Sequence, residues 1–140
     1  MADYKNSIYK ALLEKMDSSY LSDEVKTTLE ALKKKGYRLA IGSSSKNAKY
    51  ILYKLGLDDF FDAVSDGNNI TKSKPDPEVF LKAKDMLGLK ACECVVVEDA
   101  ISGIDAANSG GFYSVGIGPA SHYKKACRRI KKFSSLLKIK

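Results

Sequence analysis

Apolar residues in this chain recur either at helical spacing or in short unbroken runs. Val25, Leu29 and Leu32 stand at i, i+4 and i+7, which predicts a helix that a basic turn and Gly36 bring to an end. The continuous apolar run at 94–97 is typical of a central parallel strand that is covered on both faces. The hydrophobic pattern therefore predicts both amphipathic helices and buried strands.

Helices and strands are expected to alternate along the chain. The expected helices cover residues 3–16, 22–35, 46–55, 77–87 and 100–109, and the expected strands cover residues 37–42, 63–65, 94–97, 113–117 and 128–130. Such alternation predicts βαβ units, a parallel sheet and helices on both of its faces. We therefore expect an α/β fold, a Rossmann-like doubly wound parallel sheet, which binds ligands beyond the carboxyl ends of its strands.

Composition places the chain among globular proteins of one ordinary domain. It has 140 residues, of which 44% are hydrophobic and 29% charged. No apolar run approaches the roughly 20 residues that a membrane helix needs, and the polar first residues do not resemble a secretory signal. Cys92, Cys94 and Cys127 are a poor disulfide framework, because their number is odd. We expect free thiols in a reducing compartment and predict a cytoplasmic protein.

The formal net charge of +7 is concentrated toward the end of the sequence. No acidic residue follows Asp105, whereas the basic residues beyond it are Lys124, Lys125, Arg128, Arg129, Lys131, Lys132, Lys138 and Lys140. A basic tail can indicate nucleic-acid binding. Aromatic groups that would stack on bases are not interleaved with these charges, so we expect a solvated terminal helix and edge strand instead, with no nucleic-acid or membrane partner.

The first candidate site follows the predicted strand at 37–42. Gly42 leads into three hydroxyl residues, a cation and an amide, which are Ser43, Ser44, Ser45, Lys46 and Asn47. Backbone N–H groups at a helix N-terminus, with hydroxyl donors beside them, form a binding site for anions. The segment predicts phosphate binding, although Ser45 could serve only as a helix N-cap.

A second candidate lies in the loop before the helix at 77–87. Pro75 restricts the backbone next to Lys74, so this lysine is expected on a rigid loop instead of a helix. A fixed ammonium group is what a transferring phosphoryl group needs for charge neutralisation. The alternative is a solvated surface lysine, which is how we interpret the neighbouring Lys72.

Two adjacent carboxylates, Glu98 and Asp99, follow the buried run at 94–97. Acids at the end of a central strand are costly unless a cation or hydrogen-bond donors compensate them. Hard oxygen ligands suit Mg²⁺, and the two other segments supply a matching anion site. We therefore predict a metal site here, in preference to a helix cap at Asp99 beside a solvated Glu98.

Ser43, Lys74 and the pair Glu98-Asp99, in this order and at these strand ends, resemble the second, third and fourth motifs of the haloacid dehalogenase (HAD) superfamily. The similarity covers residues 21 to 137 and so most of the chain. The segments most similar to β-phosphoglucomutase and its near relatives are Ser43-Ser44-Ser45-Lys46-Asn47, Lys74-Pro75-Asp76-Pro77 and Glu98-Asp99-Ala100-Ile101-Ser102-Gly103-Ile104.

This resemblance implies a Mg²⁺-dependent phosphoryl transfer through an aspartyl-phosphate, acting on a phosphorylated sugar. It implies that Ser43 hydrogen-bonds the transferring phosphoryl group, and that Lys74 balances its charge and orients the nucleophile. Glu98-Asp99 would lie at the Mg²⁺ site, with Asp99 as the firmer ligand. In the mutases, the counterparts of Lys46-Asn47 hold the non-transferring phosphate of a sugar bisphosphate.

The first motif of the superfamily, an apolar strand that ends in Asp-x-Asp-Gly, has no counterpart in this sequence. Asp66-Gly67 follows a short apolar stretch, but Asn68 stands where the second Asp belongs. Residues 1–20 are expected to be the remnant of a cap or linker helix, and residues 21–140 the HAD-like core. Without a nucleophile no covalent intermediate can form, and the sheet would lack a central strand. We expect the chain alone to be inactive, with that strand supplied by a companion chain or lost by truncation.

Three functions remain open from the sequence. The leading one is the interconversion of β-glucose 1-phosphate and glucose 6-phosphate, which Ser45-Lys46-Asn47 favours over the close alternative of a HAD sugar-phosphate phosphatase. The third is a non-catalytic binding module, a degenerate core that retains a phosphate or partner site. The sequence holds no Gly-x-Gly-x-x-Gly or Walker loop that would favour a nucleotide-binding protein.

Overall fold

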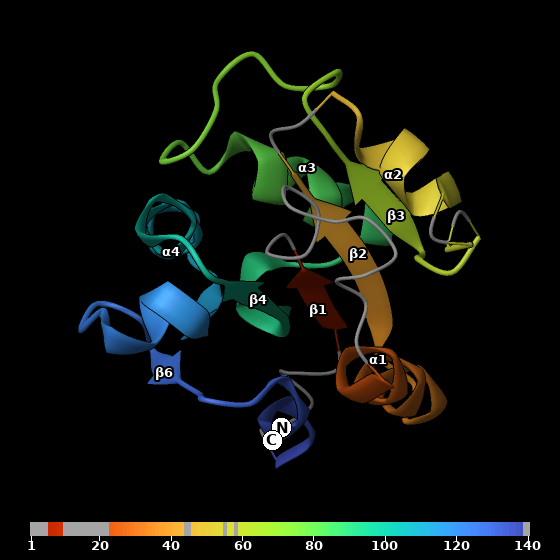
Figure 1. Cartoon of the computed structure of the whole chain (residues 1–140). Coiled ribbons are helices and arrows are strands. Elements are labelled where there is room, and N and C mark those ends of the chain that lie inside the picture. Colours follow the sequence, from red (N-terminus) through yellow and green to blue (C-terminus); the bar gives the residue numbers. More distant parts are fainter. Residues whose placement is uncertain (1–5, 10–22, 44–45, 55, 58, 139–140) are drawn as a thin grey trace.

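Parallel strands form one sheet with helices on both sides (Figure 1). The computed structural model describes residues 6–9, 23–43, 46–54, 56–57 and 59–138. The strands are β1 (Asn6–Tyr9), β2 (Arg38–Gly42), β3 (Ala63–Ser65), β4 (Cys94–Glu98), β5 (Tyr113–Gly116) and β6 (Arg128–Arg129). The helices are α1 (Asp23–Lys34), α2 (Ala48–Lys54), α3 (Glu78–Leu87) and α4 (Ile101–Ser109), with short 3₁₀ segments η2 (Ala91–Glu93), η3 (Gly118–His122) and η4 (Phe133–Lys138).

The strands lie in the order β3-β2-β1-β4-β5-β6, and each described pair is parallel. Because all of them run the same way, their carboxyl ends share one rim of the sheet. The expected α/β, Rossmann-like doubly wound architecture is thereby confirmed.

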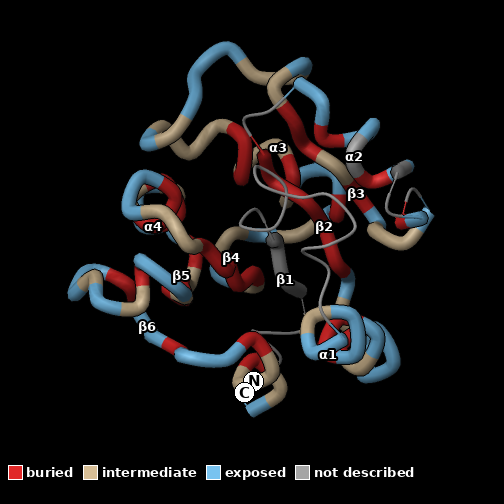
Figure 2. The backbone as a smooth tube through the Cα atoms, viewed as in Figure 1, coloured by how far each residue is buried: buried red, intermediate tan, exposed pale blue. Residues whose placement is uncertain are grey.

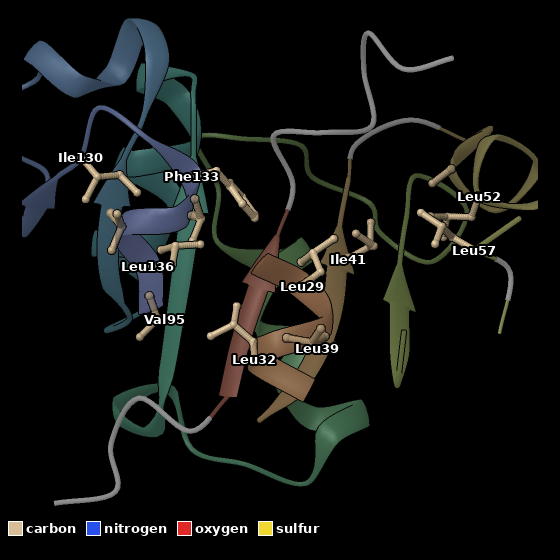
Figure 3. Packing of buried hydrophobic residues seen from close by; sticks show 13 residues of the cluster. Leu29, Leu32, Leu39, Ile41, Leu52, Leu57, Val95, Ile130, Phe133 and Leu136 are labelled. Carbon is tan, nitrogen blue, oxygen red and sulfur yellow. The ribbon is translucent and has the colours of Figure 1, made fainter. Parts of the chain in front are cut away.

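Alternate residues of the central strands supply two separate hydrophobic layers. Leu39 and Ile41 of β2 face a cluster that includes side chains of α1, α2 and η4, whereas Ala40 between them belongs to the cluster under α3 and α4. Figure 3 shows Leu29 of α1 packed near Leu39 and Ile41. In Figure 2 the buried backbone runs along β2 and β4 through the middle of the molecule. Burial on both faces explains why these strands are apolar at nearly every position.

Residues Asn6–Tyr9 form a central strand, which corrects the expectation of a helix over this stretch. β1 pairs with β2 on one side and with β4 on the other, so Tyr9 lies beside both Ile41 and Val97. The expectation that the sheet lacks a central strand is therefore wrong. The remainder of the predicted helix at 3–16 lies outside the described residues, and the division at residue 20 stays a prediction.

The basic end of the chain forms an edge strand and a short 3₁₀ segment. Arg128–Arg129 is exposed at the β6 edge of the sheet, as expected for a solvated strand. Phe133 and Leu136 of η4 are buried against the α1 face of the core. The Glu24 carboxylate accepts hydrogen bonds from the backbone N–H and the hydroxyl of Ser134, at 3.0 and 2.8 Å, and these fix η4 to α1. Among the described helices, none is long and apolar enough to cross a membrane.

The packing of β2 can be tested with one methyl group. Ile41 is 0% exposed in the centre of the sheet, so Ile41→Val should lower the free energy of unfolding by about 0.5–1.5 kcal/mol. The matched control is Ile101→Val in α4, where the side chain is 52% exposed and little should change. Urea unfolding measures both. Equal losses in the two variants would contradict the described placement of β2.

Candidate functional site

Lys74 links the carboxyl ends of two strands that are not neighbours in the sheet. Its Nζ donates a hydrogen bond to the carbonyl of Gly42, the last residue of β2, at 3.2 Å. The same Nζ lies 3.9 Å from Oε2 of Glu98, the last residue of β4. Because β1 runs between β2 and β4, the ammonium group sits at the rim where these three strands end.

Burial and an aromatic ring hold Lys74 in this place. Its side chain is only 4% exposed, and Nζ lies 4.9 Å from the centre of the Phe80 ring in α3. An ammonium over an aromatic face is attracted by the electron-rich ring. Lys74 is therefore a fixed positive charge, as its position beside Pro75 predicts, and the Lys74–Pro75 peptide bond is cis.

Glu78, at the start of α3, anchors the loop that carries Lys74. Its Oε1 accepts hydrogen bonds from the backbone N–H groups of Thr71 and Lys72, at 2.9 and 2.7 Å. These two bonds lower the pKa of Glu78 from 4.5 to about 2, so the carboxylate stays charged at any ordinary pH. Asp76 in turn accepts the N–H of Glu78 at 3.0 Å, which fixes the start of the helix.

Glu98 is a fully buried acid whose charge is compensated on both oxygens. Oε1 accepts the backbone N–H groups of Asp99 and Ala100, each at 3.1 Å, and Oε2 faces Lys74. A buried carboxylate is costly unless donors and a cation surround it. The structure therefore brings together Lys74 and Glu98, which the sequence placed at different strand ends.

Asp99 is half-buried and follows Glu98 at the rim. Each carboxylate oxygen has two lone pairs, so Glu98 can keep its present bonds and still offer a lone pair to a cation. Magnesium usually takes one or two protein carboxylates and completes its shell with water and phosphate oxygens. Glu98 and Asp99 supply two such carboxylates, so they fit a magnesium site. In the described part of the chain, no group of three or more His, Cys, Asp or Glu side chains gathers as a fuller metal site.

Ser43 directly follows β2 and is fully buried, with its backbone N–H bonded to the Ser65 carbonyl at 2.9 Å. Lys46 and Asn47 are exposed just before α2. Ser44 and Ser45 lie outside the described residues. The predicted phosphate loop therefore starts at the rim beside Lys74 and reaches the surface within a few residues.

A turn at residues 66–69 supports this loop. Asp66 is 2% exposed; its Oδ1 accepts the N–H of Asn68 at 2.9 Å, and its N–H donates to Asn69 at 2.7 Å. The Asn68 side chain then donates to the Lys46 carbonyl at 3.0 Å. The turn that follows β3 thus braces the segment that follows β2.

The three cysteines differ in their exposure to solvent. Cys94 is fully buried in β4, and burial raises the pKa of its thiol to about 12, whereas Cys92 and Cys127 are exposed. All three are free thiols, as expected.

A groove of about 530 Å³ lies elsewhere, over α1. Its lining is Thr27, Glu30, Ala31, Lys33, Lys34 and Phe60. It shares none of the rim residues and holds no convergent set of acids or donors like that around Lys74, so the rim is the better candidate for chemistry.

The ends of β2 and β4, joined by a buried lysine, carry the spaced motifs that the sequence identified. Residues 2–111 match the family of haloacid dehalogenase-like hydrolases. The chain belongs to this family. The HAD resemblance of the sequence is thereby confirmed.

Relatives in the HAD family include a mutase and a phosphatase. The chain is 38% identical over 114 residues to "Beta-phosphoglucomutase" of Bacillus subtilis, which covers 81% of this chain and 50% of the relative. It is 40% identical over 76 residues to "Fructose-1-phosphate phosphatase YqaB" of Escherichia coli, covering 54% of this chain and 40% of the relative. The chain thus spans half or less of the length of these two relatives.

Solved structures show the same fold. The crystal structure of β-phosphoglucomutase from Clostridium difficile superposes with a TM-score of 0.79 at 32% identity, covering 89% of this chain and 56% of that one. A HAD phosphatase from Thermococcus onnurineus gives a TM-score of 0.77 at 28% identity, covering 89% and 64%. The β-phosphoglucomutase-like character of this HAD core is therefore clear.

The anchor of the Lys74 loop predicts an unusual acid titration. The folded state holds the pKa of Glu78 low, so its bonds to Thr71 and Lys72 stabilise the loop fully above pH 4.5 and are lost as the pH falls through about 2. The amide-proton shifts of Thr71 and Lys72 should therefore titrate near pH 2 in NMR spectra, and Glu78→Gln should abolish that titration. A midpoint near 4.5 would show that the anchor does not form.

Proposed function

We propose that this chain is the core of a phosphoryl-transfer enzyme that acts on a sugar phosphate. The observation that carries the proposal is the buried ammonium of Lys74, held between the ends of β2 and β4. A desolvated, fixed cation at the rim of a parallel sheet suits a group that develops negative charge during transfer. The two relatives whose names give phosphorylated sugars as substrates support the same class of reaction.

The roles follow from the positions of the side chains. Lys74 neutralises the transferring phosphoryl group, and Ser43, one residue beyond the Gly42 carbonyl that Lys74 contacts, hydrogen-bonds the same group. Lys46 and Asn47, just before α2, bind a second, non-transferring phosphate, and Ser44 and Ser45 are further proposed phosphate-binding residues. The exposed position of Lys46 and Asn47 supports this role, because a free substrate must reach them from solvent.

Asp99 and Glu98 are the proposed ligands of Mg²⁺. When bound, the ion would supply charge to phosphate oxygens during transfer. Glu98 has a second task, because its carboxylate also holds Lys74 at the rim. Asp99 is the firmer ligand of the two, since it is not committed to Lys74 by any described contact.

The nucleophile is the part that this sequence does not provide. β1 occupies the central position beside Lys74, but its residues Asn6-Ser7-Ile8-Tyr9 include no carboxylate. We propose that the chain alone does not turn over substrate, and that activity needs a strand ending in Asp-x-Asp in the place that β1 occupies here, from a segment lost by truncation or from a companion chain. A cytoplasmic location accompanies this proposal.

Mutase and phosphatase remain the two candidate reactions. The extra cation and amide of Lys46-Asn47 favour the mutase, because a bisphosphate has a second phosphate to hold. A completed chain, in which the first motif with its Asp-x-Asp strand has been restored, should convert β-glucose 1-phosphate to glucose 6-phosphate in a coupled assay only when a sugar bisphosphate primer is present. Release of inorganic phosphate from fructose 1-phosphate, with no primed mutase turnover, would instead assign the phosphatase.

Lys74 can be tested in the same completed chain. Lys74→Ala should lower turnover by about 10²–10³-fold, the usual cost of losing one preorganised charge-stabilising group. The matched control is Lys72→Ala in the same loop, whose exposed side chain should leave turnover unchanged. Circular dichroism verifies that both variants fold. Turnover of Lys74→Ala close to that of the parent would refute the proposed site.

The proposed role of Asp99 as a Mg²⁺ ligand can be tested through the metal dependence of activity. Asp99→Asn removes one charged ligand, so the Mg²⁺ concentration that gives half-maximal activity should rise by about tenfold or more. Asp85→Asn, an exposed acid in α3, serves as the control. An unchanged Mg²⁺ requirement in Asp99→Asn would place the ion elsewhere.

A further inference from the structure

The first turn of α4 passes directly over the Glu98 carboxylate. A Cβ atom built on Gly103 would lie 2.0 Å from Cδ of Glu98, 2.1 Å from its Cγ and 2.2 Å from its Oε2. Atoms of neighbouring side chains do not approach this closely, so the carboxylate occupies the volume that any side chain at position 103 would fill. The absence of a side chain at Gly103 is thus what leaves room for the Glu98 carboxylate.

Glu98 cannot yield this space without cost. Its side chain is fully buried, and its Oε1 satisfies two backbone N–H groups at the entry to α4. Its Oε2 faces Lys74 at 3.9 Å, a distance that a displacement of the carboxylate would change. Displacement would therefore strain the bonds to the buried N–H groups and alter the ion pair at the same time.

An ordinary helical glycine would behave in the opposite way. Alanine is better than glycine inside a helix, because it loses less backbone entropy on folding. Gly103 lies within α4, with its N–H bonded to the Ala100 carbonyl at 3.1 Å. If open space surrounded it, Gly103→Ala would stabilise the protein.

We infer that Gly103 is a positioning residue for Lys74, acting through Glu98. The missing side chain keeps room for the carboxylate under α4, and the carboxylate sets where the ammonium lies at the rim. The inference deepens the proposed function and rests on it for the role of Lys74 in chemistry. The geometry of Gly103, Glu98 and Lys74 can still be tested without any turnover.

The first test measures stability in the full chain. Gly103→Ala should lower the midpoint of urea unfolding, the reverse of the usual change for a helical glycine. Glu98→Ala removes Cγ, Cδ and Oε2, so in that background Gly103→Ala should no longer be destabilising and should raise the midpoint. Ser102→Ala, at the exposed neighbouring position, controls for any change in this turn. A Gly103→Ala protein as stable as the parent, or more so, would overturn the inference.

The second test measures the position of Lys74 itself, and it needs only the single variants. Lys74 is nearly buried, so an acylating reagent should modify it slowly compared with the exposed Lys72. Gly103→Ala should speed the acylation of Lys74 several-fold, while Lys72 and the Ser102→Ala protein keep the parent rates. Unchanged acylation of Lys74 in a destabilised Gly103→Ala protein would overturn the inference, because Gly103 would then serve packing alone.

Neither readout involves phosphate or magnesium. If Lys74→Ala leaves the turnover of the completed chain unchanged, the proposed function fails, whereas Gly103 is judged by the acylation of Lys74. The two ideas can therefore fail separately.

Discussion

The buried ion pair between Lys74 and Glu98 is the contact on which the candidate site depends. The Lys74 ammonium group contacts the last residue of β2 and the last residue of β4, although β1 lies between these two strands. Ion pairs on a protein surface contribute little, but a pair taken out of water must be matched on every atom. Here the Gly42 carbonyl and the Phe80 ring contact the ammonium group, two backbone N–H groups donate to Oε1 of Glu98, and Oε2 faces the ammonium group at 3.9 Å. The site is therefore organised before any ligand arrives.

The surrounding fold explains how such a pair can be kept in place. Each of the strands β2 and β4 is covered on both faces, so their ends move little relative to each other. The loops of the site follow these rigid strand ends, and a polar residue outside the proposed chemistry fixes each of them by hydrogen bonds. Glu78 holds the loop of Lys74, and Asn68 holds the segment of Lys46. The sheet supplies the rigidity and the loops supply the functional groups.

Many elements of the fold could be predicted from local sequence. The features that could not be predicted all depend on contacts between particular side chains or strands, which local patterns do not show. The apolar run of β4 and the stripe of α1 are strong periodic signals, and both elements form where they were expected. The supporting contacts of Glu78, Phe80 and Gly103 join residues whose pairing no periodicity reveals. β1 was assigned wrongly because its apolar residues suggested a helix. Two parallel strands with open hydrogen-bonding edges outweigh a weak local preference, and the pairing of Ile8 with both Ala40 and Val96 shows that outcome.

The position of β1 separates the needs of the fold from those of the chemistry. A strand between β2 and β4 is required so that both edges find backbone partners, and almost any sequence can meet that requirement through its N–H and C=O groups. The proposed phosphoryl transfer through a covalent intermediate also requires a carboxylate at the end of that strand, and Asn6-Ser7-Ile8-Tyr9 contains none. The Lys74–Glu98 pair is built from the ends of β2 and β4 alone, so it can exist whichever strand lies between them. The HAD fold can thus be complete in backbone hydrogen bonding whether or not its central strand carries a carboxylate.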